Sequence, residues 1–110
     1  MLNKRELDIL KILLEAETPL IAIDIVYKSG NLTQSTVTCI LRKFLNQGLV
    51  EVVGFGRSGK VLSRQYSATE KAKEAVINHF VEFYCRINGV ISIVELFKHL
   101  DDQKLLVTGN

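Results

Sequence analysis

The chain has 110 residues, of which 47% are hydrophobic, and a formal net charge of +2. This length predicts one domain with at most an appendage, and this apolar content excludes a disordered chain. No apolar run approaches the ~20 residues that a membrane-spanning helix needs, so we expect no membrane protein. The N-terminal segment contains acidic residues and no cleavage-like site, so we expect no signal peptide and a cytoplasmic location.

Cysteine and histidine usage argues against a bound metal. Cys39 and Cys85 lie far apart in the sequence, on separate predicted helices, and no CxxC pair occurs. Neither a disulfide framework nor a zinc site is expected from this pattern. Cys85 together with His79 and His99 does not form a ligand motif either, so we predict structural roles for these three residues. We expect no metal and no other cofactor.

Positive charge is concentrated in the middle of the chain. Residues 28–67 carry six Lys or Arg and one Glu, whereas the segments before and after them carry a slight excess of acidic residues. Such a basic block is the electrostatic footprint of a protein that binds a polyanion. A chance fluctuation in surface charge would produce the same pattern, so charge alone leaves both interpretations open.

The first two predicted helices are short and closely spaced. A helix over residues 4–16 begins with a capping box formed by Asn3 and Glu6. A second helix over residues 21–29 ends at Gly30, where a left-handed residue is favoured. The inner stripe of the first helix is predicted to consist of Leu7, Leu10, Leu13 and Leu14.

The third predicted helix, residues 33–47, has two chemically different sides. Thr33 is a good N-cap, and Gly48 follows the last helical residue. The apolar side comprises Val37, Ile40, Leu41 and Phe44. The opposite side comprises Ser35, Cys39, Arg42 and Asn46, with Thr38 and Lys43 at its borders. The apolar side indicates firm packing, and the polar side is slim enough to lie against another molecule.

A hairpin is predicted next. Residues 49–53 and 61–67 are rich in β-branched side chains and favour strands. Between them, residues 54–60 contain three glycines and predict a long loop at the tip of the hairpin. This predicted tip carries Arg57 and Lys60.

Two helices are predicted after the hairpin, over residues 68–88 and 92–100. Their capping boxes are Ser67-x-x-Glu70 and Ser92-x-x-Glu95. Ala72, Val76, Phe80, Phe83 and Ile87 recur along the longer helix at spacings of three and four. This stripe either packs on its own domain or crosses the same helix of a second copy; its length and two phenylalanines favour the second copy. The predicted dimer interface is Val76, Phe80, Phe83, Tyr84 and Ile87. The tail after Asp101 is expected to fray.

This order of elements is the layout of a winged helix-turn-helix, which is mainly α with a small β-hairpin. In such a module the third helix enters the major groove of DNA, and the hairpin tip contacts an adjacent groove or the phosphates. Ser and Thr hydroxyls bind bases or phosphates, and Arg42 can bind a phosphate or the guanine edge. The N-terminus of this helix also favours a phosphate.

Two segments carry a resemblance to known DNA-binding proteins. The stretches "LDILKILLEAETPLIAIDIVYK" and "LTQSTVTCILRKFLNQGLVE" resemble the DNA-binding half of the penicillinase-repressor (BlaI/MecI-like) family and the broader MarR-like winged-helix regulators. The strongest match is Ser35-Thr36-Val37, then Leu41, Phe44 and Gly48-Leu49-Val50, in register; a second is Tyr66-x-x-Thr69-Glu70-Lys71. One departure is Ile21, which stands where the family has a Ser or Thr cap. Residues after 72 match poorly, so induction by proteolysis is not implied.

The resemblance implies a homodimeric transcriptional repressor that binds a short two-fold operator in double-stranded DNA. Residues 1–67 would form the winged-helix DNA-binding domain, and residues 68–110 a C-terminal helical dimerisation segment. Gln34, Ser35, Thr36, Thr38 and Arg42 match DNA-facing positions of the family. The predicted DNA contacts also include five residues that are added for their position or their charge: Thr33, Lys43, Arg57, Lys60 and Arg64.

Other interpretations remain open from the sequence. A winged helix can serve as a protein–protein interaction module, and a plasmid or phage DNA-organising protein would have the same pattern. An enzyme is disfavoured because no paired carboxylates, nucleophile–base pair or metal set is present. Cys39 is either a thiol sensor or a small residue tolerated near DNA; we favour the second, because no activating group clearly neighbours it. Any small-molecule or protein effector remains undetermined.

Overall fold

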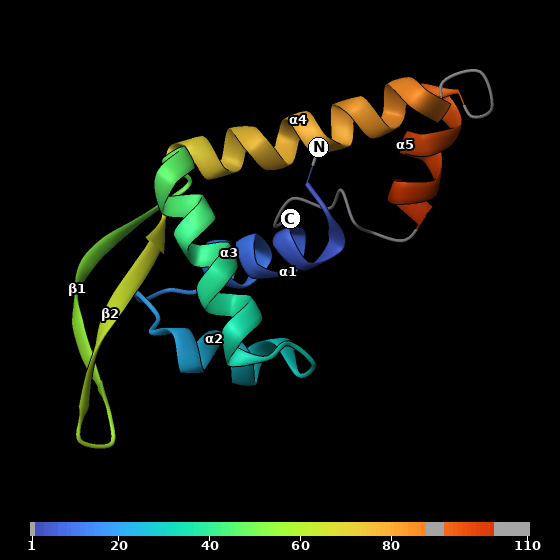
Figure 1. Ribbon diagram of the computed structural model, residues 1–110. Coiled ribbons are helices and arrows are strands. Elements are labelled where there is room, and N and C mark those ends of the chain that lie inside the picture. Colours follow the sequence, from blue (N-terminus) through green and yellow to red (C-terminus); the bar gives the residue numbers. More distant parts are fainter. Residues whose placement is uncertain (1, 88–91, 103–110) are drawn as a thin grey trace. The chain divides into compact units, whose positions relative to one another are not determined.

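The computed structural model describes residues 2–87 and 92–102, and seven elements follow one another along the chain (Figure 1). They are α1 (Lys4–Glu15), α2 (Ala22–Ser29), α3 (Gln34–Gln47), β1 (Val50–Ser58), β2 (Val61–Ala68), α4 (Glu70–Ile87) and α5 (Ile93–Asp102). The two strands form one antiparallel hairpin. The predicted fold class, mainly α with a small hairpin, is confirmed.

The start of α1 is as predicted, but its buried side is not. The side chain of Asn3 accepts a hydrogen bond from the amide of Glu6 at 2.8 Å, and the amide of Asn3 donates to the Glu6 carboxylate at 3.0 Å. The buried side chains of α1 are Glu6, Ile9, Leu10 and Leu13. Leu7 and Leu14 are only half-buried. The predicted all-leucine stripe is therefore partly wrong, because Ile9 and the charged Glu6 lie on the buried side of the helix.

Helices α2 and α3 end as their sequences predict. Gly30 and Gly48 adopt left-handed conformations with φ of 77° and 75°. The Thr33 hydroxyl accepts a hydrogen bond from the amide of Thr36 at 3.2 Å and so caps α3. Ile21 occupies the N-cap position of α2 without a side-chain hydrogen bond. The core between the first three helices and the hairpin base is formed by Ile9, Leu10, Leu13, Leu20, Ile25, Leu32, Val37, Leu41, Phe44, Leu49, Val50 and Ala72.

The hairpin has longer strands and a shorter turn than predicted. Strand β1 continues to Ser58 and β2 begins at Val61, which leaves Gly59 and Lys60 as a two-residue turn. Gly59 has a φ of 62°, the left-handed value that such tight turns require. The prediction of a loop over residues 54–60 is therefore wrong. The paired strands project beyond the three helices (Figure 1).

The glycines of β1 make room for side chains on one face of the hairpin. A Cβ on Gly54 would lie 2.9 Å from the Oε1 atom of Gln65. A Cβ on Gly56 would lie 3.1 Å from the Nε2 atom of Gln65 and 3.2 Å from the Cγ2 atom of Ile21. Glycine therefore occurs in this strand because Gln65 and the buried Ile21 occupy the space that a side chain would need.

The base of the hairpin is fixed on two sides. Leu20, in the segment before α2, exchanges both backbone hydrogen bonds with Tyr66 of β2, at 2.8 and 3.0 Å. The Thr69 hydroxyl donates to the carbonyl oxygens of Gly48 and Leu49, at 2.7 and 3.1 Å, at the end of α3. The direction of the hairpin is thus set relative to both α2 and α3.

The two later helices begin differently from one another. Ser67 pairs with Glu51 in the hairpin, so the predicted capping box between Ser67 and Glu70 is wrong; the strand pairing outcompetes the local cap. At the start of α5 the hydroxyl of Ser92 accepts a hydrogen bond from the amide of Glu95 at 3.1 Å, as the second predicted box requires.

The chain divides into two compact units, residues 1–79 and 80–110, and the division falls inside α4. The first unit thus includes the first turns of α4, whose Ala72 is fully buried. The expected assignment of DNA binding to residues 1–67 and dimerisation to residues 68–110 stays a prediction. The expected fraying of the tail beyond residue 102 lies outside the described residues. None of the described helices combines the length and apolar character that membrane crossing requires.

Candidate nucleic-acid interface

The polar side of α3 is accessible in the protomer. Gln34, Ser35, Thr38, Cys39 and Arg42 line one open hollow on the surface of this helix, and all five are exposed. The opposite side is held in the core, where Val37, Leu41 and Phe44 are at most 1% exposed. The helix is therefore clamped along one side and offers hydroxyl, amide and guanidinium groups along the other.

Thr33 and Thr36 lie at the N-terminus of this surface and are bonded to each other. Besides accepting from the Thr36 amide, the Thr33 hydroxyl donates to the Thr36 hydroxyl at 3.0 Å. Both residues are predicted to contact DNA, and their hydroxyl groups are hydrogen-bonded to each other at the helix N-terminus. Amides of the first helical turn lack intrahelical acceptors, so this end remains suited to a phosphate.

Lys43 is placed differently from the other predicted cations. Its Nζ atom lies 2.6 Å from the Glu6 carboxylate, which is almost fully buried at the start of α1. Burial raises the pKa of the Glu6 carboxyl, but hydrogen bonds from Lys43 and the Asn3 amide and the charge of Lys43 outweigh it, so its pKa lies below the usual value. Lys43 thus ties α3 to α1, a role that the sequence analysis missed.

The remaining predicted cations have no acidic partner within the described part of the chain. The ion pairs there are Lys11–Glu15, Lys43–Glu6 and Lys73–Glu70. All four remaining cations are exposed: Arg42, Arg57, Lys60 and Arg64. Arg42 lies on α3 and the other three lie on the hairpin, so these four cations are divided between α3 and the hairpin of the same unit.

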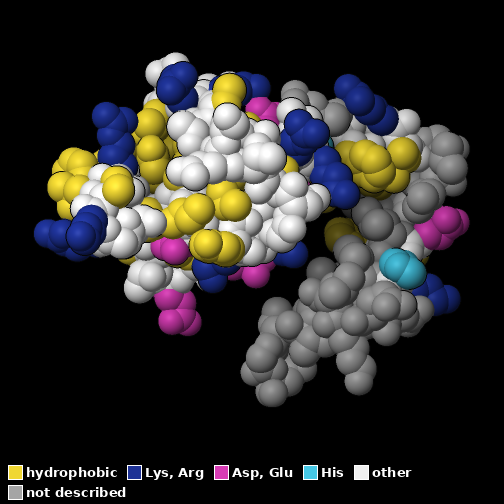
Figure 2. All heavy atoms as spheres, turned by 60° about the horizontal axis from the view of Figure 1, so that its bottom comes forward, with side chains coloured by type: hydrophobic (Ala, Val, Ile, Leu, Met, Phe, Trp, Pro, Cys, Tyr) yellow, Lys and Arg dark blue, Asp and Glu magenta, His cyan; other side chains and the backbone are white. Residues whose placement is uncertain are grey.

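The register of the hairpin places apolar side chains beside its cations. Phe55 pairs with Arg64, and Arg57 pairs with Leu62. Because paired residues of adjacent strands share a face, these four side chains lie together, and we call them the wing face. Phe55 and Leu62 are each 62% exposed. In Figure 2, yellow hydrophobic and dark-blue cationic side chains gather at the left of the view, where the hairpin lies.

The sequence pattern indicated the cations of this hairpin but not Phe55 and Leu62. The alternation of side chains in β1 and β2 would have identified them. That signal was lost because residues 54–60 were interpreted as a loop.

The predicted dimer interface on α4 is exposed only in part. Phe80 and Phe83 are 59% and 52% exposed, whereas Val76, Tyr84 and Ile87 are half-buried. Val76 packs against the core of the first unit. Two further apolar residues of α4, Ile77 and Val81, are 60% and 54% exposed. The predicted stripe does not include these two residues, and the dimer interface itself stays a prediction.

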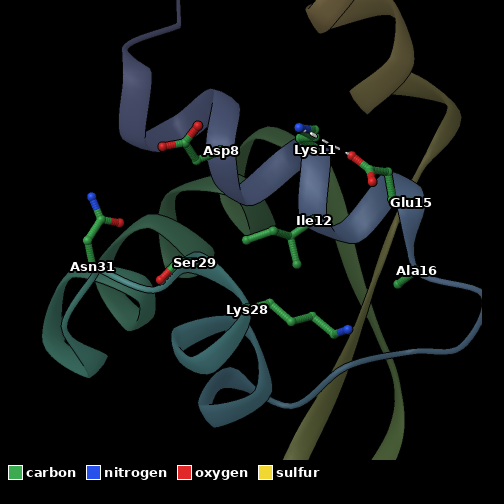
Figure 3. A pocket seen from close by; sticks show the side chains of 8 residues that line it. All are labelled: Asp8, Lys11, Ile12, Glu15, Ala16, Lys28, Ser29 and Asn31. Carbon is green, nitrogen blue, oxygen red and sulfur yellow. Dashed lines mark ion pairs between the residues drawn. The ribbon is translucent and has the colours of Figure 1, made fainter.

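A second hollow lies away from α3 and the hairpin, between α1 and the end of α2 (Figure 3). Its lining mixes acidic and basic side chains, and the Lys11–Glu15 ion pair of 3.7 Å lies on its α1 side. The lining residues are Asp8, Lys11, Ile12, Glu15, Ala16, Lys28, Ser29 and Asn31. This balance of charges marks no particular ligand.

The thiols and histidines are not gathered into a site. Cys39 and Cys85 are free and exposed. Within residues 2–87 and 92–102, no group of three His, Cys, Asp or Glu side chains could hold a metal ion. Cys39 lies among the polar residues of α3, so any role for it depends on what binds that surface.

Comparisons with known proteins identify the fold. No protein-family model matches the sequence, and no curated protein matches it. Among solved structures, PadR of Bacillus subtilis in complex with operator DNA aligns with a TM-score of 0.62 at 15% identity, covering 96% of this chain and 69% of PadR. NMB1585, a MarR family regulator from Neisseria meningitidis, aligns with a TM-score of 0.54 at 22% identity, covering 96% of this chain and 73% of NMB1585.

A third solved structure is similar over the same extent. The transcriptional regulator SlyA aligns with a TM-score of 0.50 at 18% identity, covering 94% of this chain and 72% of SlyA. At these identities the likeness establishes a shared architecture. The chain therefore has the winged helix-turn-helix fold, with α3 in the position of the third helix and β1–β2 as the wing.

Proposed function

We propose that this protein is a sequence-specific, double-stranded DNA-binding transcriptional regulator that acts as a homodimeric repressor in the cytoplasm. Helix α3 lies in the major groove, and the hairpin is the wing. The observation that carries this proposal is the exposed polar side of α3, together with the burial of Val37, Leu41 and Phe44 on its opposite side. A winged helix that presents this surface fits the groove of a duplex.

Each group on this surface has a defined role in the proposal. Ser35 and Thr38 bind base edges or phosphates, because a hydroxyl both donates and accepts. Arg42 binds a phosphate or the O6 and N7 atoms of guanine. The wing cations Arg57, Lys60 and Arg64 bind phosphates. Lys43 contributes indirectly, since its pairing with Glu6 helps to hold α3 against α1.

The exposed apolar residues of α4 support a second copy of the chain as partner. Ile77, Phe80, Val81 and Phe83 each leave about half or more of their surface exposed. An apolar helix face of this kind is covered in most small proteins by another element or another copy. Two copies place two α3 helices on one duplex, which gives a two-fold operator.

The test begins with a duplex enriched from a random pool by the unaltered protein. Arg42→Ala should weaken binding to this duplex about tenfold or more, since one phosphate or guanine contact is lost. Its thermal unfolding should be unchanged, because Arg42 is exposed. Lys11→Ala, which removes an exposed cation of α1, is the matched control and should bind normally.

The outcomes separate the proposal from its rivals. Equal binding by Arg42→Ala contradicts α3 as the reading helix. Enrichment of no particular sequence, with tight salt-sensitive binding, indicates a DNA-organising protein. An absence of any duplex binding favours a winged helix that contacts another protein, a role to which the exposed apolar wing residues Phe55 and Leu62 would be suited.

A further inference from the structure

The wing face combines exposed apolar side chains with positively charged ones. Phe55 and Leu62 leave 62% of their surface open, and each pairs across the strands with an arginine. The opposite face carries Gly54, Gly56, Ser63 and Gln65, with Val61 at its outer end. The two exposed apolar side chains that pair with arginines therefore lie on one face of the projecting hairpin, whereas Val61, which is also exposed, pairs with Ser58 on the other face.

The positive charges of the hairpin favour a negatively charged partner. Arg57 and Arg64 lie beside the two apolar side chains, and Lys60 lies in the turn. Glu51, the acidic residue of the two strands, pairs with Ser67 on the opposite face, near the base. An acidic protein surface and a duplex both match this charge. The walls of the minor groove match it better, because they consist of apolar sugar edges between two rows of phosphates.

The size of the hairpin limits how it can enter a groove. Paired strands lie ≈ 4.8 Å apart before their side chains are counted. The minor groove of B-DNA is only ≈ 6 Å wide. A hairpin that carries Phe55 and Leu62 on one face fits only if the groove widens around these side chains. Apolar side chains inserted from the minor groove unstack base steps and bend the duplex.

We propose that Phe55 and Leu62 form an apolar wedge that enters the minor groove beside the site of α3, with Arg57 and Arg64 on the flanking phosphates, and widens and bends the DNA. This inference rests on the proposed function. Its consequence is that the protein discriminates sequences by how easily they deform under the wing, in addition to contacts made by α3.

Hydroxyl-radical footprinting tests the wedge directly, because the radical attacks the sugars that line the minor groove. The probe is the duplex enriched from a random pool, with fluorophores at both ends to report bending. Phe55→Ala and Leu62→Ala should each lose sugar protection at the wing position and show reduced energy transfer between the ends. Affinity should fall about five- to twentyfold, as expected when exposed apolar area no longer becomes buried.

Val61→Ala is the matched control. Val61 is 64% exposed on the same hairpin, but its pairing with Ser58 places it on the opposite face. This variant should retain the footprint, the bend and the affinity within about twofold. All three altered side chains are exposed, so unchanged circular dichroism and thermal unfolding confirm that differences in binding do not arise from misfolding.

Each result decides the inference. Loss of protection under the wing with retained protection under α3 supports it. An unchanged footprint and bend in Phe55→Ala overturn the wedge and leave the proposed function intact. Altered self-association of Phe55→Ala with normal DNA contacts identifies the wing face as a protein contact and overturns the wedge. The absence of any footprint by the unaltered protein contradicts the proposed function and the wedge together.

Discussion

At the scale of single residues, the carboxylate of Glu6 connects two helices that are distant in sequence. It accepts hydrogen bonds from the Asn3 amide at 3.0 Å and from Lys43 at 2.6 Å while being only 3% exposed. A buried carboxylate is stable only when such partners replace its water. This contact links α1 to α3 in addition to the apolar packing of Val37, Leu41 and Phe44.

Glu6→Gln should lower the free energy of unfolding by roughly 1–3 kcal/mol at neutral pH, because the Lys43 ammonium loses its ionised partner. Glu82→Gln, a change at an exposed residue of α4, should be neutral. Chemical denaturation of the two variants beside the unaltered protein measures the difference. A Glu6→Gln protein as stable as the unaltered one would show that the ion pair contributes nothing net.

The pH dependence of the same residue has a defined sign. The pKa of the Glu6 carboxyl is lowered in the folded chain from an ordinary value of 4.5, so the unfolded chain takes up the proton first. Its stabilisation is complete above pH 4.5 and is lost as the pH falls through the lower folded pKa. The stability gap between Glu6→Gln and the unaltered protein should therefore shrink toward acidic pH.

At the scale of elements, the hairpin depends on space that its glycines provide. Gly56→Ala should destabilise the fold by about 1 kcal/mol, because the new methyl group presses on the Cγ2 atom of the buried Ile21. Denaturation of a double-mutant cycle with Ile21→Ala checks the cause. The penalty for Gly56→Ala should become smaller in that background, and an undiminished penalty would contradict the contact.

Local signals in the sequence were sufficient for most helix boundaries. The caps at Asn3 and Thr33 and the glycines after α2 and α3 lie where predicted, because capping depends on neighbours within a few residues. The accessible polar side of α3 was predictable from its periodicity for the same reason. The caps at the ends of α3 and the periodicity of its side chains together predict a helix that is packed on one side and exposed on the other.

The errors arose where distant residues decide the structure. Glycines 54 and 56 indicated a loop, but Gln65 and Ile21, which lie elsewhere in the sequence, fill the space above them. Ser67 had the spacing of an N-cap, but pairing with Glu51 keeps it in the strand. The pairing of Lys43 with Glu6, 37 positions away, could not be recognised from the local pattern, and the predicted DNA contact of Lys43 stays a prediction.

At the scale of the whole molecule, dimerisation and DNA binding can be tested together. Ile77, Phe80, Val81 and Phe83 expose apolar surface on α4, and a charge placed there disfavours burial against a second copy. Phe80→Glu combined with Phe83→Glu should sediment as a monomer, whereas the proposed function predicts that the unaltered protein sediments as a dimer at the same concentration. Both positions are exposed, so the unfolding transition of the first unit should be retained.

The salt dependence of DNA binding then measures how many copies engage the duplex. Each copy offers Arg42, Arg57, Lys60 and Arg64 without acidic partners among the described residues, so two copies neutralise about eight phosphates. Counterion release predicts a slope of log K against log salt of about −7 if two copies bind, and about half that for the doubly substituted protein if it binds as a monomer. Equal slopes for the two proteins would mean that a single copy makes all the contacts, and that the apolar side of α4 serves some purpose other than placing a second α3 on the operator.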